Sequence, residues 1–154
     1  MRGLVQRVRE ASVTVVGEVA GEAAGEIVGS IGAGLCVLVG VTHADTVATA
    51  TRLADKIWHL RVMDDAAGVM NMSVADTTRA VLIVSQFTLY GDTSAGRRPS
   101  WIAAARPEHA EPLVTAVVER LRSLGATVAT GRFRTEMHVA LVNDGPVTVL
   151  LEVD

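Results

Sequence analysis

The chain has 154 residues, the size of one ordinary domain, and can bury a core without disulfides or metals. Hydrophobic residues make up 49% of the sequence and aromatic residues only 3%, so Val, Leu, Ile and Ala must build that core. The net charge of −3 argues against a broad basic surface for duplex nucleic acid, because phosphate neutralisation dominates such binding. We expect one domain over residues 1–154.

The cysteine, the histidines and the apolar runs indicate the compartment and the cofactor content of the protein. The single cysteine, Cys36, lies in an apolar run, so we expect it to fill core space in a reducing compartment. No apolar run is long enough to cross a bilayer, and the first nine residues lack the apolar segment of a signal peptide. The histidines are scattered singly, unlike metal ligands. We expect a cytoplasmic, soluble protein without membrane contact, metal or other cofactor.

β-Branched runs predict several strands in the first part of the chain. Leu4–Val8 and Val13–Val19 are short, which predicts antiparallel strands joined by tight turns. Leu35–Val41 is continuously apolar and fits a strand buried on both faces. The glycines before it do not indicate a nucleotide-binding loop, because no GxGxxG opens a helix here.

Two segments carry apolar side chains at helical spacing. The first spans about residues 45–60, with Asp45 or Thr46 as its N-cap. The second spans about residues 107–124, with a proline in its first position and Gly125 after its end. A further proline, Pro112, falls in the second turn, where it either moves the start of the helix or bends its first turn.

Two loops contain paired charges. Asp64 and Asp65 could form a metal or acid pair, but adjacent carboxylates before a glycine favour a solvated turn. Arg97 and Arg98 lie in the loop 91–100, where they either hold a phosphate by forked hydrogen bonds or are simply exposed.

Ala80–Tyr90 is predicted as a strand whose character changes halfway. Its first half is apolar, whereas Ser85, Gln86 and Thr88 place polar side chains at the end of a buried strand. Such groups must find partners or bind a ligand, and sites on α/β sheets are built at strand ends. A strand that simply ends in a loop is an equally good interpretation.

The last segment is interrupted by Asn143-Asp144-Gly145-Pro146. The flanking runs, His138–Val142 and Val147–Val153, alternate as strands do, so the default prediction is a hairpin at the Asp-Gly pair. Proline cannot donate to a strand ladder, and an X-Pro bond can be cis at little cost, so a specialised Gly-Pro turn is the alternative. The order of elements predicts an α/β fold with mostly antiparallel strands and both main helices on one side.

The segments SQFTL at 85–89 and NDGPVT at 143–148 together resemble the two signature segments of the D-aminoacyl-tRNA deacylase family. Further matching segments follow in the expected order, so the resemblance covers essentially the whole chain. It implies a three-layer α/β/β fold and a homodimer. It also implies that the Gly145-Pro146 bond is cis and enters the partner's pocket beside residues 85–88. The substrate would be the aminoacyl ester at the 3′ end of tRNA.

The same resemblance implies roles for individual residues. Its catalytic residues would be Thr88, Ser85 and Gln86. Residues for substrate binding and chiral selection would be Gly145, Pro146, Phe87, Met137 and Asn143. Carbonyls of the Gly-Pro pair would bind the substrate's amino group, so that an L side chain collides with this wall while a D side chain does not. Glycine would also be accepted, including glycine on tRNA for alanine.

Two routes for the hydrolytic step remain open. Thr88 resembles a nucleophile, but no histidine or lysine lies near it in sequence to activate it. We favour assistance by the ribose 2′-OH, with main-chain N–H groups stabilising the oxyanion. Ala95, Arg97 and the segment 134–136 depart from the family pattern at the rim of the expected pocket.

Two other functions compete with this hypothesis. One is a non-catalytic nucleic-acid-binding protein of the same fold, which would need a basic surface. The other is a general small-ester hydrolase that uses Thr88 and accepts esters without an adenosine.

Overall fold

The structure is a computed structural model that describes residues 1–19 and 22–154. In this described part the helices are α1 (Val47–His59) and α2 (Pro107–Ser123), with 3₁₀ segments η1 (Val74–Asp76) and η2 (Phe87–Tyr90). The strands, in chain order, are β1 (Arg2–Val19), β2 (Glu22–Ile31), β3 (Gly34–Gly40), β4 (Met63–Asp64), β5 (Met70–Met72), β6 (Ala80–Ser85), β7 (Val128–Thr130) and β8 (Met137–Glu152).

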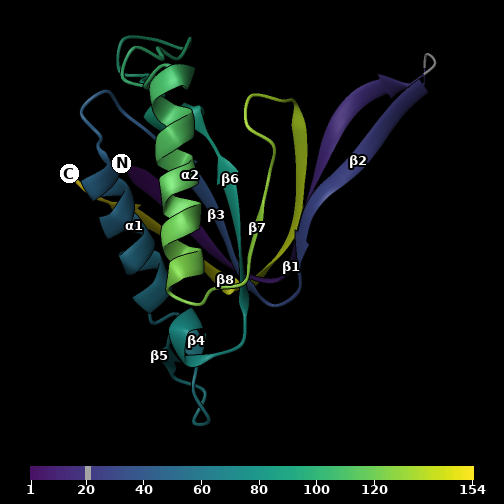
Figure 1. Cartoon of the computed structure of the whole chain (residues 1–154), viewed down its shortest axis with the longest axis vertical. Helices are drawn as coiled ribbons and strands as arrows, with labels where there is room; N and C mark the ends of the chain where they lie inside the picture. The colour runs from purple at the N-terminus through teal and green to yellow at the C-terminus, as the bar shows by residue number, and fades with distance from the viewer. Residues whose placement is uncertain (20–21) are drawn as a thin grey trace.

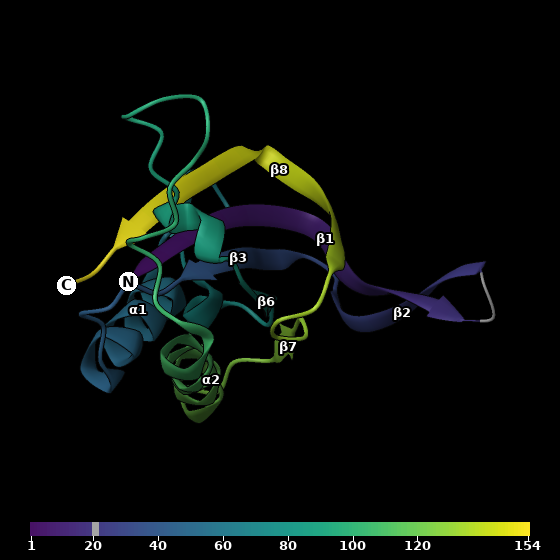
Figure 2. The same cartoon turned by 90° about the horizontal axis from the view of Figure 1, so that it is seen from above.

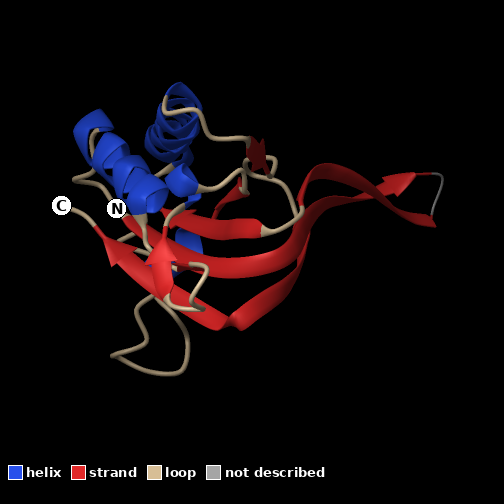
Figure 3. Cartoon of the chain, turned by 90° about the horizontal axis from the view of Figure 1, so that it is seen from below, coloured by secondary structure: helices blue, strands red, loops and turns tan. Residues whose placement is uncertain are grey.

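One mixed sheet dominates the fold. Its strand order is β2-β1-β3-β6-β7, and β8 pairs with β1. The pairs that involve β1 are antiparallel, whereas β3–β6 and β6–β7 are parallel. Both α-helices cover the same face, and the β1–β2 hairpin extends away from them (Figures 1 and 3). The predicted α/β class with two helices on one side is confirmed.

The two helices begin as their sequences predict. Thr46 caps α1, since its hydroxyl accepts the Thr49 N–H while the Thr49 hydroxyl accepts the Thr46 N–H. α2 begins at Pro107, so Pro112 does not move its start. None of the helices in the described ranges is both long and apolar enough to cross a membrane.

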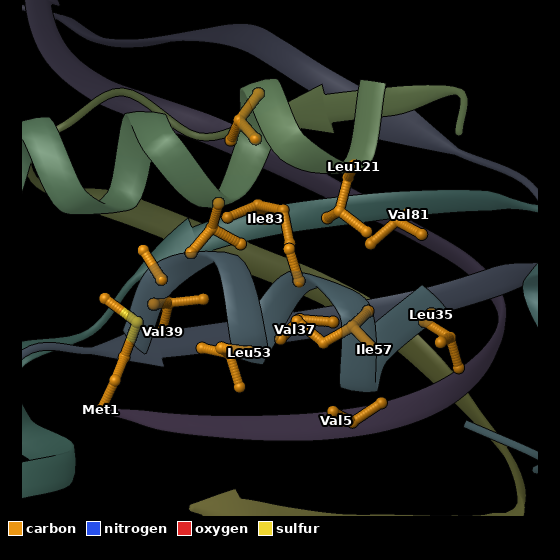
Figure 4. Packing of buried hydrophobic residues seen from close by; sticks show 14 of the residues in the cluster. Met1, Val5, Leu35, Val37, Val39, Leu53, Ile57, Val81, Ile83 and Leu121 are labelled. Carbon is orange, nitrogen blue, oxygen red and sulfur yellow. The ribbon is translucent and has the colours of Figure 1, made fainter. Parts of the chain in front are cut away.

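Side chains of β3 and β6 alternate between two apolar clusters. Those facing the helices form the larger cluster, in which Val37 and Ile83 pack against Leu53 and Leu121 (Figure 4). Those facing the other way include the fully buried Cys36 and Leu82 and the partly buried Leu38. β3 is therefore buried on both faces, as its continuous apolar run predicts.

The second cluster is covered by the same sheet, which coils back on itself. Met137 and Leu141 of β8 pack against it from the far side of β1. The backbones of β2 and β7 also approach, since a Cβ placed on Gly29 would lie 2.4 Å from the Thr130 carbonyl oxygen. Figure 2 shows the bend of β8 over β1. The second β layer is thus the outer part of one coiled sheet.

The predicted break between Leu4–Val8 and Val13–Val19 is wrong, because both belong to the single strand β1. Its pairing with β8 shifts register between Gln6 and Glu10. Such irregularities bend a strand without reversing it, and the intervening sequence contains no Gly or Pro to form a turn. β1 can therefore pair with β3 through one half and with β2 through the other.

Candidate functional site

The predicted strand Ala80–Tyr90 ends earlier, at Ser85. Gln86 makes the last bond to the sheet, since its N–H donates to the Val39 carbonyl at 2.8 Å. The chain then tightens into η2, where the Gly91 N–H donates to the Thr88 carbonyl at 3.0 Å. The polar residues therefore mark a real change of structure, from strand to 3₁₀ turn.

Arg2 of β1 fastens η2 to the sheet. Its Nη1 donates to the Leu89 carbonyl at 2.8 Å, and its guanidinium lies 4.7 Å from the centre of the Tyr90 ring. Burial, with a smaller contribution from the Asp45 charge, raises the pKa of the Tyr90 hydroxyl to about 12. Sequence reasoning missed this contact, which joins residues far apart in the chain.

A cavity of about 660 Å³ opens beside the end of β6. Ser85, Gln86 and Phe87 contribute to its wall, together with Met137 from the start of β8. The Phe87 ring packs edge to face against Trp101, with 5.3 Å between ring centres and 72° between planes. This volume is typical of a small-molecule site, and the sequence-predicted residues at 85–87 and 137 meet in it.

The turn before β8 brings Met137 to this cavity. A Cβ on Gly131 would lie 2.9 Å from the Met137 sulfur, so a side chain at position 131 would make the flexible end of Met137 shift. The Arg132 N–H also points to the sulfur at 3.3 Å. In the same turn Arg134 adopts a positive φ of 59° and lines the cavity.

Thr88 is exposed and is not among the residues that line the cavity. Its hydroxyl accepts a hydrogen bond from the Gln86 amide. Because η2 begins at Phe87, the N–H groups of Phe87 and Thr88 have no partner within the turn. These two main-chain donors lie at the start of η2, where Phe87 lines the cavity.

The expected hairpin at Asp144-Gly145 is wrong, because β8 continues through it and pairs with β1 on both sides. Val8 pairs with Asn143 and Gln6 with Thr148, so β8 has three more residues than β1 between these pairs. The segment 143–147 is therefore a large bulge, which we call the NDGP bulge. Within it the Gly145-Pro146 bond is cis, as the family resemblance implies, and Gly145 has a φ of 122°.

Arg7 holds the NDGP bulge from behind. Only 7% of this residue is exposed, and its Nε donates to the Asp144 carbonyl at 3.2 Å. Its Nη1 donates to the Val62 carbonyl at 2.8 Å and pairs with Asp64 at 3.1 Å. Sequence reasoning missed Arg7, although an arginine in phase with the buried Val5 was a usable signal.

Asn143 closes the other side of the NDGP bulge. Its side-chain amide donates to the Arg7 carbonyl at 2.9 Å and to the Val147 carbonyl at 3.0 Å. These bonds satisfy backbone oxygens that the interrupted ladder leaves open. Gly145 and Pro146 are left exposed on the surface.

The structure does not bring the NDGP bulge to the cavity of its own chain. Asn143 lies in register with Val8 and, across the sheet, with Gly34 and Ala80, at the start of β6. Ser85 lies at the other end of β6, five residues along, or about 17 Å at the usual rise of a strand. Within one chain the two signature segments are thus separated.

Cys36 and Asp65 have structural roles. Burial raises the pKa of the Cys36 thiol to about 11, which suppresses its thiolate. The N–H groups of Val69 and Ala67 lower the pKa of Asp65 by donating to its carboxylate, which thereby forms the solvated turn predicted for this loop. Within the described residues, no three His, Cys, Asp and Glu side chains gather as a metal ion would require.

Comparison with known proteins identifies the family of the chain. The family model for D-Tyr-tRNA(Tyr) deacylase matches residues 4–152. D-aminoacyl-tRNA deacylase of Nocardia farcinica is 58% identical over 99% of both chains, and that of Streptomyces coelicolor is 55% identical over 99% of this chain and 100% of its own. The fold and these matches define a hydrolase of the ester bond in aminoacyl-tRNA. The chain belongs to the D-Tyr-tRNA(Tyr) deacylase family, as its two signature segments predict.

Solved structures share the whole fold. One described as c-Myc DNA Unwinding Element Binding Protein is 37% identical, with a TM-score of 0.89 over 100% of this chain and 99% of its own. Another, a probable eukaryotic D-amino acid tRNA deacylase, has a TM-score of 0.78 over 99% and 98% of the two chains. At 14% identity the second likeness concerns the fold alone.

Proposed function

We propose that this chain hydrolyses the ester of D-aminoacyl-tRNA with the 3′-terminal adenosine bound in the 660 Å³ cavity. Family membership supports the reaction. The lining of the cavity supports binding of the adenosine there. Ser85, Gln86 and Phe87 place polar groups and an aromatic ring beside an otherwise mostly apolar wall. The acidic net charge is compatible, since recognition of one terminal nucleotide needs few phosphate contacts.

We infer that a second copy of the chain completes the site. The observation that carries this step is the separation of the two signature segments along β6, with the exposed Gly145-Pro146 pair at one end and Ser85 at the other. A symmetric dimer would let each subunit contribute its NDGP bulge to the cavity of the other. The hydrogen bonds from Arg7 to the Asp144 and Val62 carbonyls would hold the NDGP bulge in a fixed shape, as insertion into a partner's pocket requires.

Selection between D and L substrates would follow from shape. The carbonyls of the partner subunit's Gly145 and Pro146 would accept hydrogen bonds from the substrate's amino group, and the same backbone would block an L side chain. A D side chain would point toward open space. Glycine has no side chain to exclude, so glycyl-tRNA, including tRNA for alanine mischarged with glycine, would also be hydrolysed.

For the chemical step we propose assistance by the ribose 2′-OH. The main-chain N–H groups of Phe87 and Thr88 at the start of η2 would stabilise the oxyanion. Thr88 is a poor nucleophile here, because its hydroxyl already bonds to Gln86 and no base is among its bonded partners in the described residues. Ser85 and Gln86 would orient the adenosine, and Met137 would pack against it. The reaction would take place in the cytoplasm, where tRNA is charged.

Deacylation of three substrates tests the proposal. D-tyrosyl-tRNA, L-tyrosyl-tRNA and glycyl-tRNA are incubated separately with the protein, and the remaining ester is followed over time. We expect rapid loss of the D ester and the glycyl ester, with the L ester unchanged. Equal loss of D and L esters would contradict selection by the Gly-Pro wall.

The competing function is non-catalytic nucleic-acid binding. It is supported by the description of the 37% identical structure as a DNA-unwinding-element binding protein. It predicts no hydrolysis of any of the three esters by the folded protein. A small-ester hydrolase predicts instead that simple amino-acid esters without adenosine are cleaved equally well.

A further inference from the structure

The charged side chains in the wall of the 660 Å³ cavity are two arginines, Arg106 and Arg134, among the residues that the structure describes. No described Asp or Glu side chain lines this wall, and most of it is apolar. An apolar cavity with positive charge and no counter-charge suits a ligand with a flat body and an anionic group.

Arg106 and Arg134 are among the seven of the thirteen arginines that form no ion pair between described side chains. Six arginines form ion pairs with carboxylates, namely Arg2, Arg7, Arg9, Arg120, Arg122 and Arg132. The ion pairs between described side chains include neither Arg106 nor Arg134, and both are exposed. An unpaired guanidinium at a cavity wall is available for forked hydrogen bonds to a phosphate.

The backbone at both positions adds to this argument. Arg106 is the N-cap of the 17-residue helix α2, whose start adds positive potential. Arg134 has a φ of 59°, a left-handed conformation that favours glycine over a residue with a side chain. Strain of this kind is concentrated at ligand-binding positions, which points to a use for the Arg134 side chain.

We propose that Arg106 and Arg134 bind the phosphate on the 5′ side of the terminal adenosine of tRNA. This step rests on the proposed function, which supplies a substrate with that phosphate beside the cavity. The phosphate does not change during ester hydrolysis, so both arginines should bind substrate and transition state equally. Their loss should therefore raise KM and leave kcat unchanged.

The test compares a substrate with the phosphate to one without it. D-tyrosyl-tRNA and the phosphate-free ester 2′(3′)-O-D-tyrosyl-adenosine are given to wild type, Arg106→Gln and Arg134→Gln. Arg52→Gln, at an exposed position on α1, is the charge-matched control. We expect each cavity variant to raise KM for the tRNA about tenfold and to leave KM for the adenosine ester unchanged. The slope of log(1/KM) against log salt should shrink by about 0.7 per variant.

A second variant at position 134 separates binding from a structural role. Arg134→Gly relieves the left-handed backbone, so its melting temperature should rise while its KM for tRNA rises as in Arg134→Gln. An equal loss on both substrates, or no loss relative to Arg52→Gln, would overturn the phosphate site.

Binding measurements test the phosphate site independently of catalytic turnover. If wild type cleaves neither D ester, the proposed function fails, and calorimetry with adenosine 5′-monophosphate and adenosine decides the phosphate site alone. At least about tenfold tighter binding of the monophosphate, lost in Arg106→Gln and Arg134→Gln, would support it. Equal affinity of wild type for adenosine 5′-monophosphate and adenosine would overturn it.

Discussion

At the scale of single residues, Arg7 links three parts of the chain. Its buried guanidinium joins β1 to the Val62 carbonyl, to Asp64 and to the Asp144 carbonyl in the NDGP bulge. Arg9 approaches the carboxylate of Asp144 at 3.4 Å, but its side chain is 76% exposed. Asp144 is therefore contacted by a buried arginine at its main-chain carbonyl and by an exposed arginine at its carboxylate.

Replacing these two arginines should have unequal effects. Arg7→Met leaves the Val62 and Asp144 carbonyls without their donor, and we expect the free energy of unfolding to fall by about 3 kcal/mol. Arg9→Gln, the matched control, should cost less than about 1 kcal/mol because its ion pair is solvated. Urea unfolding measures both, and equal losses would contradict the assignment of Arg7 as the residue that holds the NDGP bulge.

The hydroxyl of Thr88 should be dispensable. In Thr88→Ala we expect kcat for D-tyrosyl-tRNA within about threefold of wild type, whereas loss of a true nucleophile lowers kcat by about a thousandfold or more. The complementary measurement uses D-tyrosyl-tRNA that ends in 2′-deoxyadenosine. Its hydrolysis should be slow if the 2′-OH assists, and a large defect in Thr88→Ala alone would restore Thr88 as the nucleophile.

At the scale of elements, the NDGP bulge depends on a residue without a side chain. A Cβ on Gly145 would lie 2.8 Å from Val147 Cγ2 and 3.1 Å from Arg7 Nη2, at a φ of 122°. Gly145→Ala should therefore lower the free energy of unfolding by about 1–3 kcal/mol and reduce deacylation. Gly32→Ala is the control, since a Cβ there meets nothing within 4 Å. Full activity and stability of Gly145→Ala would show that the bulge tolerates a side chain.

A separate prediction concerns the thiol of Cys36 in β3. Burial raises the pKa of Cys36 from 9.0 to about 11, so the stability gained by burying the neutral thiol is complete below pH 9 and is lost as pH rises through 11. At pH 8 the folded protein should react with a thiol reagent at least about a hundredfold more slowly than the urea-unfolded chain. Rapid stoichiometric labelling of the folded protein would place Cys36 outside the core.

At the scale of the whole molecule, the site is proposed to lie between two subunits. Gly145→Ala removes the bulge contribution and Gln86→Ala removes a cavity contribution, so each homodimer should lose most of its activity. Co-expressed and randomly paired, the two variants should form heterodimers with one intact site, which restores roughly a quarter of wild-type activity. Absence of recovery would contradict a site shared between subunits.

The control for this experiment carries both changes in one chain. Random pairing of wild type with Gln86→Ala/Gly145→Ala leaves roughly a quarter of the sites intact if the site is shared, because only wild-type homodimers work. It leaves roughly half if each chain completes its own site. The two arrangements are therefore distinguished by one activity ratio.

Local spacing was enough to predict much of this molecule. The starts of α1 and α2 are predicted from Thr46 and Pro107, since N-capping depends only on the next few residues. Burial of β3 follows from its apolar run, and the family follows from residues 85–89 and 143–148. The sequence by itself therefore determined the helices, the buried strand and the reaction class.

Contacts between distant residues decided the rest. Whether the chain turns or continues at Gly145 depends on Arg7, 137 positions before Asp144, and on pairing of both halves of β8 with β1. The same long-range pairing separates Ser85 from the NDGP bulge. Local pattern does not contain such pairings, because loop closure and sheet register depend on the whole chain. Only the tertiary structure therefore decided how the two signature segments are placed.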